Sequence, residues 1–478
     1  MRGYLASSVG VACATVLVIP LPLASGALAA PLPATAVAQA PDVPGSTQSL
    51  PLEPLRHTSE RSHGTTGQGL REQGLPEQEV DPFSLVGVVW EDPLTELEGT
   101  VEVRTRAIGS GTWSDWQQVE THNSEHAADP GTAESEARTV RGSTAPLWVG
   151  PSDGVEVRVR AADGTSSGLP EGLRLELVDP GDDPAGTGQS TGTTQTGAAG
   201  PDPVNQNPEN PESPENPESP EDPESPESPQ EPGIEPAAGR GPLGGTLIPA
   251  LNQADTEAEA AAAGDLLMGD LAAGAKPYIG PRPAIVTRKG WGADESWREK
   301  KFVYTDSVKA AFVHHSATGN HYTCAQAPSV VRSIYRYHTK SSGWRDIGYN
   351  FAVDKCGNIY EGRAGGVAKP VRGAHTLGFN TNSTGIAVLG TYSSSNPPQA
   401  AVTAVAKLTA WKLGLHGINP KGKVTLTSAG SGKYAEGVKV ELNAISGHRD
   451  GFFTDCPGNR LYGKLGSART ASAKFQGR

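Results

Sequence analysis

Three positions far apart in the sequence carry side chains that could hold one metal ion. They are His448, Cys456 and one member of the adjacent pair His314 and His315. Adjacent side chains on a strand point to opposite faces, so only one histidine of that pair can face a given site. Two imidazoles and a thiolate are typical zinc ligands, and three protein ligands leave one zinc position open, as in catalytic sites. Because no short zinc-finger spacing is present, the residue types alone also allow that these are unrelated core residues.

The cysteine count fits a metal role for Cys456. The sequence has 4 Cys, and Cys13 lies within a predicted leader over residues 1–40. Cys324 and Cys356 can pair and would close a loop of 32 residues, which stabilises a fold by about 3–4 kcal/mol on the chain-entropy model. Cys456 is then the odd thiol, free to bind a metal as a thiolate.

The elements that must position these residues are strands mixed with helices over residues 277–478. Residues 310–313 lead into the histidine pair as a strand, and residues 349–360 have the alternation and central turn of a β-hairpin. Pro328 begins one helical pattern, and residues 399–415 carry another. This mixture predicts one α/β domain.

The front of the chain has a different character. Residues 81–180 contain short runs of period-two alternation separated by Gly, Pro and Asp, which predicts an all-β, sandwich-like domain. We assign no catalytic role to this domain and interpret its tryptophans as core residues, with exposed tryptophans that bind sugar as the alternative. Residues 41–80 are polar and are predicted to be disordered. Residues 181–276 are predicted to be a Pro/Glu-rich and Ala-rich linker, in which a proline recurs at every third position from Pro208 to Pro232.

Residues 1–40 have the composition of a secretory signal peptide. Arg2 gives a charged start, an apolar run follows over residues 5–20, and small-residue cleavage motifs lie at residues 27–29 and 38–40. A single membrane anchor is the alternative, but the run is short for one. We therefore expect a secreted chain, located outside the cell or in the cell wall, where disulfides form. No later run approaches the roughly 18 apolar residues of a membrane span, so we expect no transmembrane span in the mature chain.

Charge is divided unevenly along the chain. The formal net charge is −13, yet residues 277–478 alone hold 27 Lys and Arg against 11 Asp and Glu, a charge of +16. A basic domain is attracted to an anionic partner, such as nucleic acid, a membrane surface or an acidic cell-wall polymer.

Five sequence blocks in one order carry a resemblance to a known family. The five blocks are residues 313–318, 343–351, 360–363, 373–380 and 447–458. On these blocks, the chain over about residues 283–465 resembles the peptidoglycan recognition protein and type 2 N-acetylmuramoyl-L-alanine amidase family. The front half resembles secreted actinobacterial amidases more weakly. The resemblance implies a mixed central sheet with surrounding helices and a zinc cleft.

The resemblance implies roles at the matching positions. The first histidine of the pair, His314, takes the ligand role together with His448 and Cys456, and Zn²⁺ is the implied cofactor. Tyr349 and Thr454 are the implied catalytic residues, although Tyr349 could by residue type alone be plain core. The implied reaction is hydrolysis of the amide between muramic acid and L-alanine, with these two side chains as hydrogen-bond donors to the developing oxyanion. No matched glutamate provides a general base.

Three further residues, His375, Asn380 and Arg372, are implied to bind substrate. His375 and Asn380 could equally be polar residues that stabilise a turn. The implied partner is a peptidoglycan muropeptide and not nucleic acid, and we expect a monomer.

Two other functions remain open from the sequence. Family members that lack the ligand cysteine generally bind peptidoglycan without cutting it, so a non-catalytic recognition protein is the main alternative. A cysteine hydrolase that uses Cys456 and His448 is a weaker hypothesis, because Pro457 directly after the thiol gives no helix-start activation of the usual kind.

Overall fold

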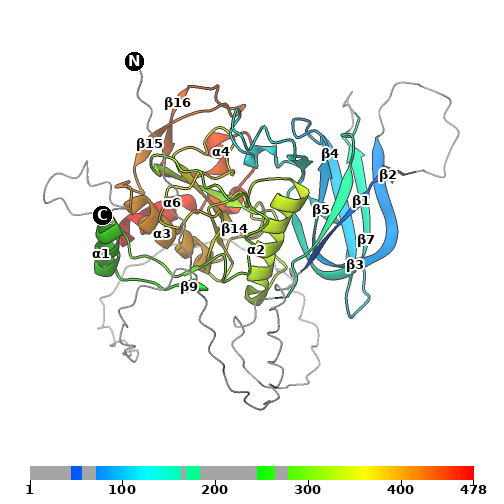
Figure 1. Cartoon of the computed structure of the whole chain (residues 1–478), viewed down its shortest axis with the longest axis horizontal. Coiled ribbons are helices and arrows are strands. Elements are labelled where there is room, and N and C mark those ends of the chain that lie inside the picture. Colours follow the sequence, from blue (N-terminus) through cyan, green and yellow to red (C-terminus); the bar gives the residue numbers. More distant parts are fainter. Residues whose placement is uncertain (1–44, 56–70, 163–167, 183–244, 264–277) are drawn as a thin grey trace, which may run out of the picture. The chain divides into compact units, whose positions relative to one another are not determined.

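The computed structural model describes residues 45–55, 71–162, 168–182, 245–263 and 278–478, whose elements are shown in Figure 1. All of these residues belong to one compact unit that extends from Val43 to Arg478. We call the described residues up to 182 the front part and those from 245 the back part. The predicted leader over residues 1–40 and the proline repeat lie outside the described residues. Within the described ranges, no helix is long and apolar enough to cross a membrane.

The front part is built on one antiparallel sheet of eight strands. The strand order is β1-β8-β3-β7-β4-β5, and β2 and β6 pair with β3 outside this path. The strands are Ser46–Pro51 (β1), Glu53–Pro54 (β2), Glu72–Trp90 (β3), Gly99–Ala107 (β4), Gln117–Val119 (β5), Gly142–Ser143 (β6), Leu147–Ala161 (β7) and Arg174–Asp179 (β8).

Alternating side chains of this sheet form the core of the front part. Val86 and Val88 of β3 and Val157 and Val159 of β7 belong to one buried cluster, as the period-two pattern predicts. Register shifts between β3 and β7 mark bulges, and bulges bend the strands that contain them. The sequence predicts a sandwich-like domain, whereas the described strands of the front part form one continuous sheet.

The front part begins earlier than the sequence predicts. Disorder was the expectation for residues 41–80, but β1, β2 and the first half of β3 lie there. β1 is polar, yet it pairs with β8 in an unbroken register from Ser46↔Asp179 to Pro51↔Arg174. Backbone hydrogen bonds hold such an edge strand, and its exposed side chains can be polar. Composition alone therefore gives no sign of it.

The back part is built on a mixed sheet of seven strands, which confirms the predicted class. The strand order is β17-β11-β14-β12-β13-β10-β9. The neighbours β17, β11, β14 and β12 are parallel, whereas β12 and β13 form the predicted antiparallel hairpin. A separate ribbon pairs β15 with β16. The strands are Leu247–Ile248 (β9), Ile285–Val286 (β10), Ala310–His315 (β11), Phe351–Val353 (β12), Ile359–Glu361 (β13), Ser383–Val388 (β14), Lys423–Thr427 (β15), Lys439–Asn443 (β16) and Ile445–Gly447 (β17).

Helices pack on both faces of the mixed sheet. On one face, Val313 and Val388 share a core with Leu408 of α3, and α6 packs beside α3. On the other face, Ala352 and Ala387 share a core with α2. The helices within the described ranges are Ser124–His126 (η1), Gln253–Ala263 (α1), Cys324–Gln326 (η3), Ala327–Arg336 (α2), Tyr337–Ser341 (η4), Gln399–Gly414 (α3), His448–Gly451 (α4), Asn459–Tyr462 (α5) and Leu465–Phe475 (α6).

Part of the predicted linker over residues 181–276 is folded. β9 and α1 lie within it, and β9 extends the mixed sheet by pairing with β10. Thr256 of α1 accepts a hydrogen bond of 2.9 Å from the backbone amide of Arg282. A strand of two residues and an Ala-rich helix carry almost no periodic pattern, so the sequence does not separate them from linker.

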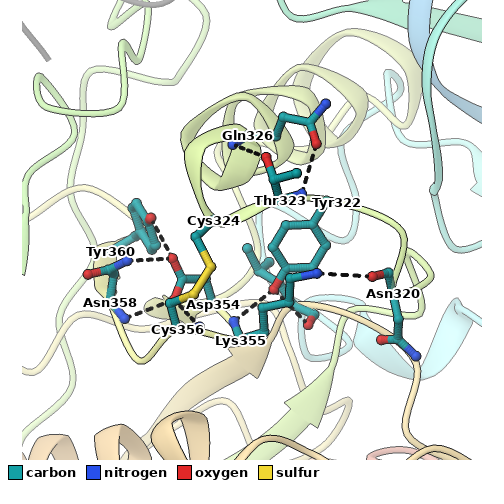
Figure 2. The surroundings of a disulfide bond; sticks show 11 residues. Asn320, Tyr322, Thr323, Cys324, Gln326, Asp354, Lys355, Cys356, Asn358 and Tyr360 are labelled. Atoms are coloured by element: carbon teal, nitrogen blue, oxygen red, sulfur yellow. Dashed lines mark hydrogen bonds between the residues drawn. A yellow bond between two sulfur atoms is a disulfide. The ribbon is translucent and has the colours of Figure 1, made fainter. Parts of the chain in front are cut away.

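A disulfide between Cys324 and Cys356 ties the β12–β13 hairpin to the start of α2 (Figure 2). Within the hairpin turn, Asp354 accepts hydrogen bonds of 2.9 Å from the Cys356 amide and from the Tyr360 hydroxyl. Among the described residues, Cys456 is the free cysteine and is buried.

The front and back parts share a hydrophobic core around α2. Leu85 and Val89 of β3 lie on the sheet face opposite to the front core, and they cluster with Val330 and Ile334 of α2. The buried guanidinium of Arg332 donates a hydrogen bond of 2.7 Å to the carbonyl oxygen of Pro180. α2 is thus covered by the mixed sheet on one side and by the front sheet on the other. This packing fixes the loops of the front part against the back part.

Candidate metal centre

Two neighbouring parallel strands end at the candidate site. β11 ends with His314 and His315, and β17 ends directly before His448. Val313 pairs with Gly447 in the parallel register, so the residues that follow them, His314 and His448, emerge side by side. The carboxyl ends of parallel strands are the edge where α/β proteins place their ligand sites.

Only one histidine of the adjacent pair joins the cluster of candidate ligands, as the strand geometry predicts. That residue is His314. His315 accepts a hydrogen bond of 3.3 Å at Nδ1 from the backbone amide of Tyr392.

Four side chains converge on one point. Cys456 Sγ lies 3.8 Å from His314 Nδ1, and the ring centroids of His314 and His448 are 4.6 Å apart. A fourth residue, His126 of the front part, places Nε2 3.9 Å from Cys456 Sγ, and its ring centroid lies 4.5 Å from that of His448. The four candidate ligand atoms all lie within 4.8 Å of one another, and all four residues are buried.

This donor set fits a zinc ion. Usual Zn–S and Zn–N bond lengths place sulfur and nitrogen about 3.6 Å apart along the edge of a tetrahedron, close to the distances of 3.8 and 3.9 Å around Cys456 Sγ. His448 Nδ1 is buried, and the described residues supply no hydrogen-bond partner for it. His448 Nε2 lies 3.2 Å from the carbonyl oxygen of Glu125. A carbonyl oxygen only accepts, so the proton is on Nε2 and the lone pair of Nδ1 is available to a metal.

The ring of His314 is also held by neighbouring groups, as the ring of His448 is held by the Glu125 carbonyl oxygen. Thr376 Oγ1 lies 3.4 Å from His314 Nε2 and 3.0 Å from His375 Nδ1. The His375 ring packs edge-on against His314, with centroids 5.3 Å apart. A contact at the second ring nitrogen fixes the tautomer and orientation of a ligand histidine.

Burial favours neutral imidazoles in the cluster. It lowers the pKa of His314 and of His448 well below 6.5, and neighbouring imidazoles add to the effect. Burial lowers the pKa of His126 to about 3. Neutral imidazole is the form that binds metal. Burial also raises the pKa of the Cys456 thiol well above 9.0, the opposite of the shift that an activated nucleophile needs, whereas a divalent cation stabilises a thiolate.

Tyr349 and Thr454 lie beside the cluster, as the resemblance implies. The ring centroid of Tyr349 lies 5.5 Å from that of His314. Burial raises the pKa of the Tyr349 hydroxyl well above 10.0, so the group keeps its proton at neutral pH. Thr454 Oγ1 accepts a hydrogen bond of 3.1 Å from the Cys456 amide and donates one of 2.9 Å to Glu125 Oε1.

The residues assigned to substrate binding have other contacts here. His375 is fully buried and stands behind His314. Asn380 Oδ1 accepts hydrogen bonds of 2.7 and 3.0 Å from the amides of His375 and Thr376, which is the turn-stabilising role that the sequence also allowed. The positive charge of Arg372 acts to lower the pKa of Asp129, in the front part, although burial outweighs it and the pKa is raised.

Two residues of the site were missed from the sequence. Glu125 and His126 belong to η1, in the loop between β5 and β6 of the front part. The front part was expected to have no catalytic role, but the structure places His126 among the candidate ligands. The only sequence signal is a pair of histidines, His122 and His126, in a short acidic stretch. That spacing by itself does not indicate a metal ligand.

A cavity of about 400 Å³ lies beside the cluster. Its lining includes Tyr349, Thr454 and Cys456 from the back part and Glu125 and His126 from the front part. Both parts of the chain therefore form its wall.

Comparisons with known proteins match both parts of the chain. The family described as N-acetylmuramoyl-L-alanine amidase matches residues 304–459, and the family described as Rv3811 N-terminal galactose-binding domain-like matches residues 33–205. Peptidoglycan-recognition protein SC2 of Drosophila simulans is 30% identical over 181 residues, which cover 38% of this chain and 84% of that protein. The human N-acetylmuramoyl-L-alanine amidase is 32% identical over 192 residues, which cover 38% of this chain and 28% of that protein. Among solved structures, Drosophila PGRP-LB is similar at 27% identity and a TM-score of 0.31, over 38% of this chain and 92% of that chain.

The amidase match contains His314, His448 and Cys456, the residues that the fold brings together. It also confirms the resemblance drawn from the five sequence blocks. The front part corresponds to a galactose-binding-like domain. The chain belongs to the family of peptidoglycan-recognition proteins and type 2 N-acetylmuramoyl-L-alanine amidases.

Proposed function

We propose that the chain is a secreted, zinc-dependent N-acetylmuramoyl-L-alanine amidase, which hydrolyses the amide between muramic acid and L-alanine in peptidoglycan. The observation that carries the proposal is the convergence of His314, His448 and Cys456, with ligand atoms within 4.8 Å of one another, beside Tyr349 and a cavity. The human relative that is named for this activity supports the reaction class.

The metal ligands and two hydrogen-bond donors, Tyr349 and Thr454, have separate roles in the proposed reaction. Bound at the three ligands, zinc supplies Lewis-acid chemistry toward the amide carbonyl and the attacking water. The hydroxyl of Tyr349, which keeps its proton at neutral pH, donates a hydrogen bond to the oxygen on which negative charge develops. Thr454 Oγ1 is a second donor of this kind when it is not bonded to Glu125.

His375 is proposed as a positioning residue rather than a substrate contact. Through Thr376 Oγ1 it holds the ring of His314. Arg372 remains a proposed contact for a carboxylate of the peptide stem, and Asn380 remains a proposed contact in the substrate cleft. The charge of +16 on residues 277–478 favours a wall polymer that bears carboxylates.

Two further features support secretion. The sequence of residues 1–40 is typical of a signal peptide. The disulfide between Cys324 and Cys356 suits an oxidising compartment.

The test is cleavage of purified peptidoglycan, followed as the release of new L-alanine amino groups. Because His126 lies among the ligands, both the full chain and its His126→Ala variant are assayed, each with and without Cys456→Ser. We expect amide cleavage in at least one of the two chains that retain Cys456, its loss on chelation and its recovery with zinc. Cys456→Ser should abolish it in either background.

Peptidoglycan binding without cleavage in both chains that retain Cys456 would refute the amidase and favour the recognition protein. Cleavage that ignores the chelator and is abolished by thiol alkylation would favour the cysteine hydrolase.

A further inference from the structure

We infer that the chain folds in a latent form, in which the front part supplies His126 as a fourth protein ligand to the zinc. The segment that carries His126, residues 124–134, is called the covering segment; in this form it occupies the substrate side of the centre. The inference rests on the proposed function, because it requires a metal at the site of His314, His448 and Cys456.

The first step of the argument is coordination. His126 Nε2 lies at 3.9 Å from Cys456 Sγ, and His314 Nδ1 lies at 3.8 Å from the same sulfur. His126 thus lies about as close to Cys456 Sγ as His314 does, and His314 is a ligand implied by the family resemblance. Four protein ligands complete a tetrahedral zinc site, as in structural sites, whereas catalytic sites keep one position open. With His126 bound, a four-coordinate zinc would have no open position for water or an amide carbonyl.

The second step is that the covering segment is anchored by specific hydrogen bonds. The backbone amide of Leu377 donates to the Glu125 carbonyl oxygen at 2.8 Å. The amide of Gly378 donates to Asp129 Oδ1 at 2.8 Å, and Asn380 Nδ2 donates to the same oxygen at 2.8 Å. These contacts use backbone and side-chain groups of the turn over residues 375–380.

The third step is charge. Glu134 and Arg363 form a bidentate ion pair of 2.7 and 2.8 Å, in which the side chains are 6% and 8% exposed. The covering segment contains Glu125, Asp129 and Glu134 and no lysine or arginine, whereas residues 277–478 carry a charge of +16. An acidic segment is therefore held in a basic domain, where an acidic substrate would otherwise bind.

The fourth step is that the covering segment contacts residues with proposed roles in catalysis and substrate binding. Thr454 Oγ1 donates a hydrogen bond of 2.9 Å to Glu125 Oε1. The ring of His126 meets Tyr349 edge-on, with centroids 5.8 Å apart. Asn380, a proposed substrate contact, donates to Asp129. In this conformation the front part supplies a ligand to the metal site, bonds to Thr454 and Asn380, and packs against the ring of Tyr349.

The test uses the full chain loaded with Co²⁺ in place of zinc, and azide as the probe. Azide shifts the visible bands of Co²⁺ only where it can enter the coordination shell. We expect a sulfur-to-cobalt band in the full chain and no shift with azide. In His126→Ala we expect the same sulfur band, a clear azide shift, and peptidoglycan cleavage at least tenfold faster than in the full chain.

Two further variants keep the test decisive. Glu134→Gln retains His126 but loosens the covering segment, so it should show a partial azide shift and an intermediate rate. His321→Ala removes an exposed histidine outside the cavity lining and should behave as the full chain.

An azide shift of equal size in the full chain and in His126→Ala would overturn the latent form but leave the amidase intact. Absence of a sulfur-to-cobalt band in every chain would instead refute the metal site, and the proposed function with it.

Discussion

Replacing Glu134 with glutamine should open the covering segment without touching the metal ligands. The carboxylate of Glu134 is bonded to both terminal nitrogens of Arg363, and both side chains are almost fully buried. Removing one partner of a buried ion pair costs about 3–5 kcal/mol. The lower end applies here, because the negative charge of Asp346 also acts on Arg363. A loss of about 3 kcal/mol raises the opening equilibrium of the segment about 100-fold.

Hydrogen exchange measures this opening at two amides. Leu377 donates to the Glu125 carbonyl oxygen and Gly378 donates to Asp129, so both become exposed when the segment leaves. We expect their exchange to be about 100-fold faster in Glu134→Gln, while amides of the mixed sheet keep their protection. Glu136→Gln is the matched control, because Glu136 is an exposed glutamate two residues further along. Equal exchange in the two variants would refute the role of the ion pair and weaken the case for a specifically docked segment.

Three other predictions follow from single contacts. Thr376→Val removes the hydroxyl beside His314 Nε2, so zinc affinity should fall about 10- to 100-fold in a competition titration; unchanged affinity would exclude the positioning role. Burial acts to raise the pKa of Glu134, but Arg363, assisted by Arg345, outweighs it and holds the pKa below 4.5. Because the pKa of Glu134 is lower in the docked state, its carboxylate stabilises docking at any pH above the ordinary glutamate pKa. This stabilisation is lost as the pH falls through the lowered pKa. The ratio of the Leu377 and Gly378 amide exchange rates between Glu134→Gln and the full chain should therefore be constant from about pH 8 to about pH 5 and decrease only in stronger acid. A ratio that decreases near neutral pH would contradict this assignment. Replacing Cys324 and Cys356 together by serine should lower the free energy of unfolding by about 3–4 kcal/mol in denaturant but leave the zinc content unchanged, and loss of zinc in this variant would show that the disulfide shapes the metal centre.

Residue chemistry and strand geometry narrowed the candidate ligands, and the resemblance to the amidase family then selected His314, His448 and Cys456. The alternation of β11 allows only one of its histidines into the cluster, and the structure selects His314. The odd cysteine count left Cys456 for another task, and the disulfide leaves it free. Local pattern thus limits the candidates, whereas the choice among them came from the resemblance.

His126 could not be predicted in this way. It lies in a loop without periodicity, and it meets Cys456 330 positions later in the chain. Its position depends on how β3 and β8 pack against α2, which is a tertiary property. The strand β1 was missed for a related reason, since its pairing with β8 rests on backbone groups that every residue carries.

The most direct measurement is X-ray absorption at the zinc edge on the purified full chain, together with its zinc content. We predict one zinc per chain with a sulfur neighbour at about 2.3 Å and nitrogen neighbours at about 2.0 Å, and loss of the sulfur in Cys456→Ser. A chain that binds no zinc, or a zinc whose neighbours are the same in Cys456→Ser, would contradict a centre formed by His314, His448 and Cys456.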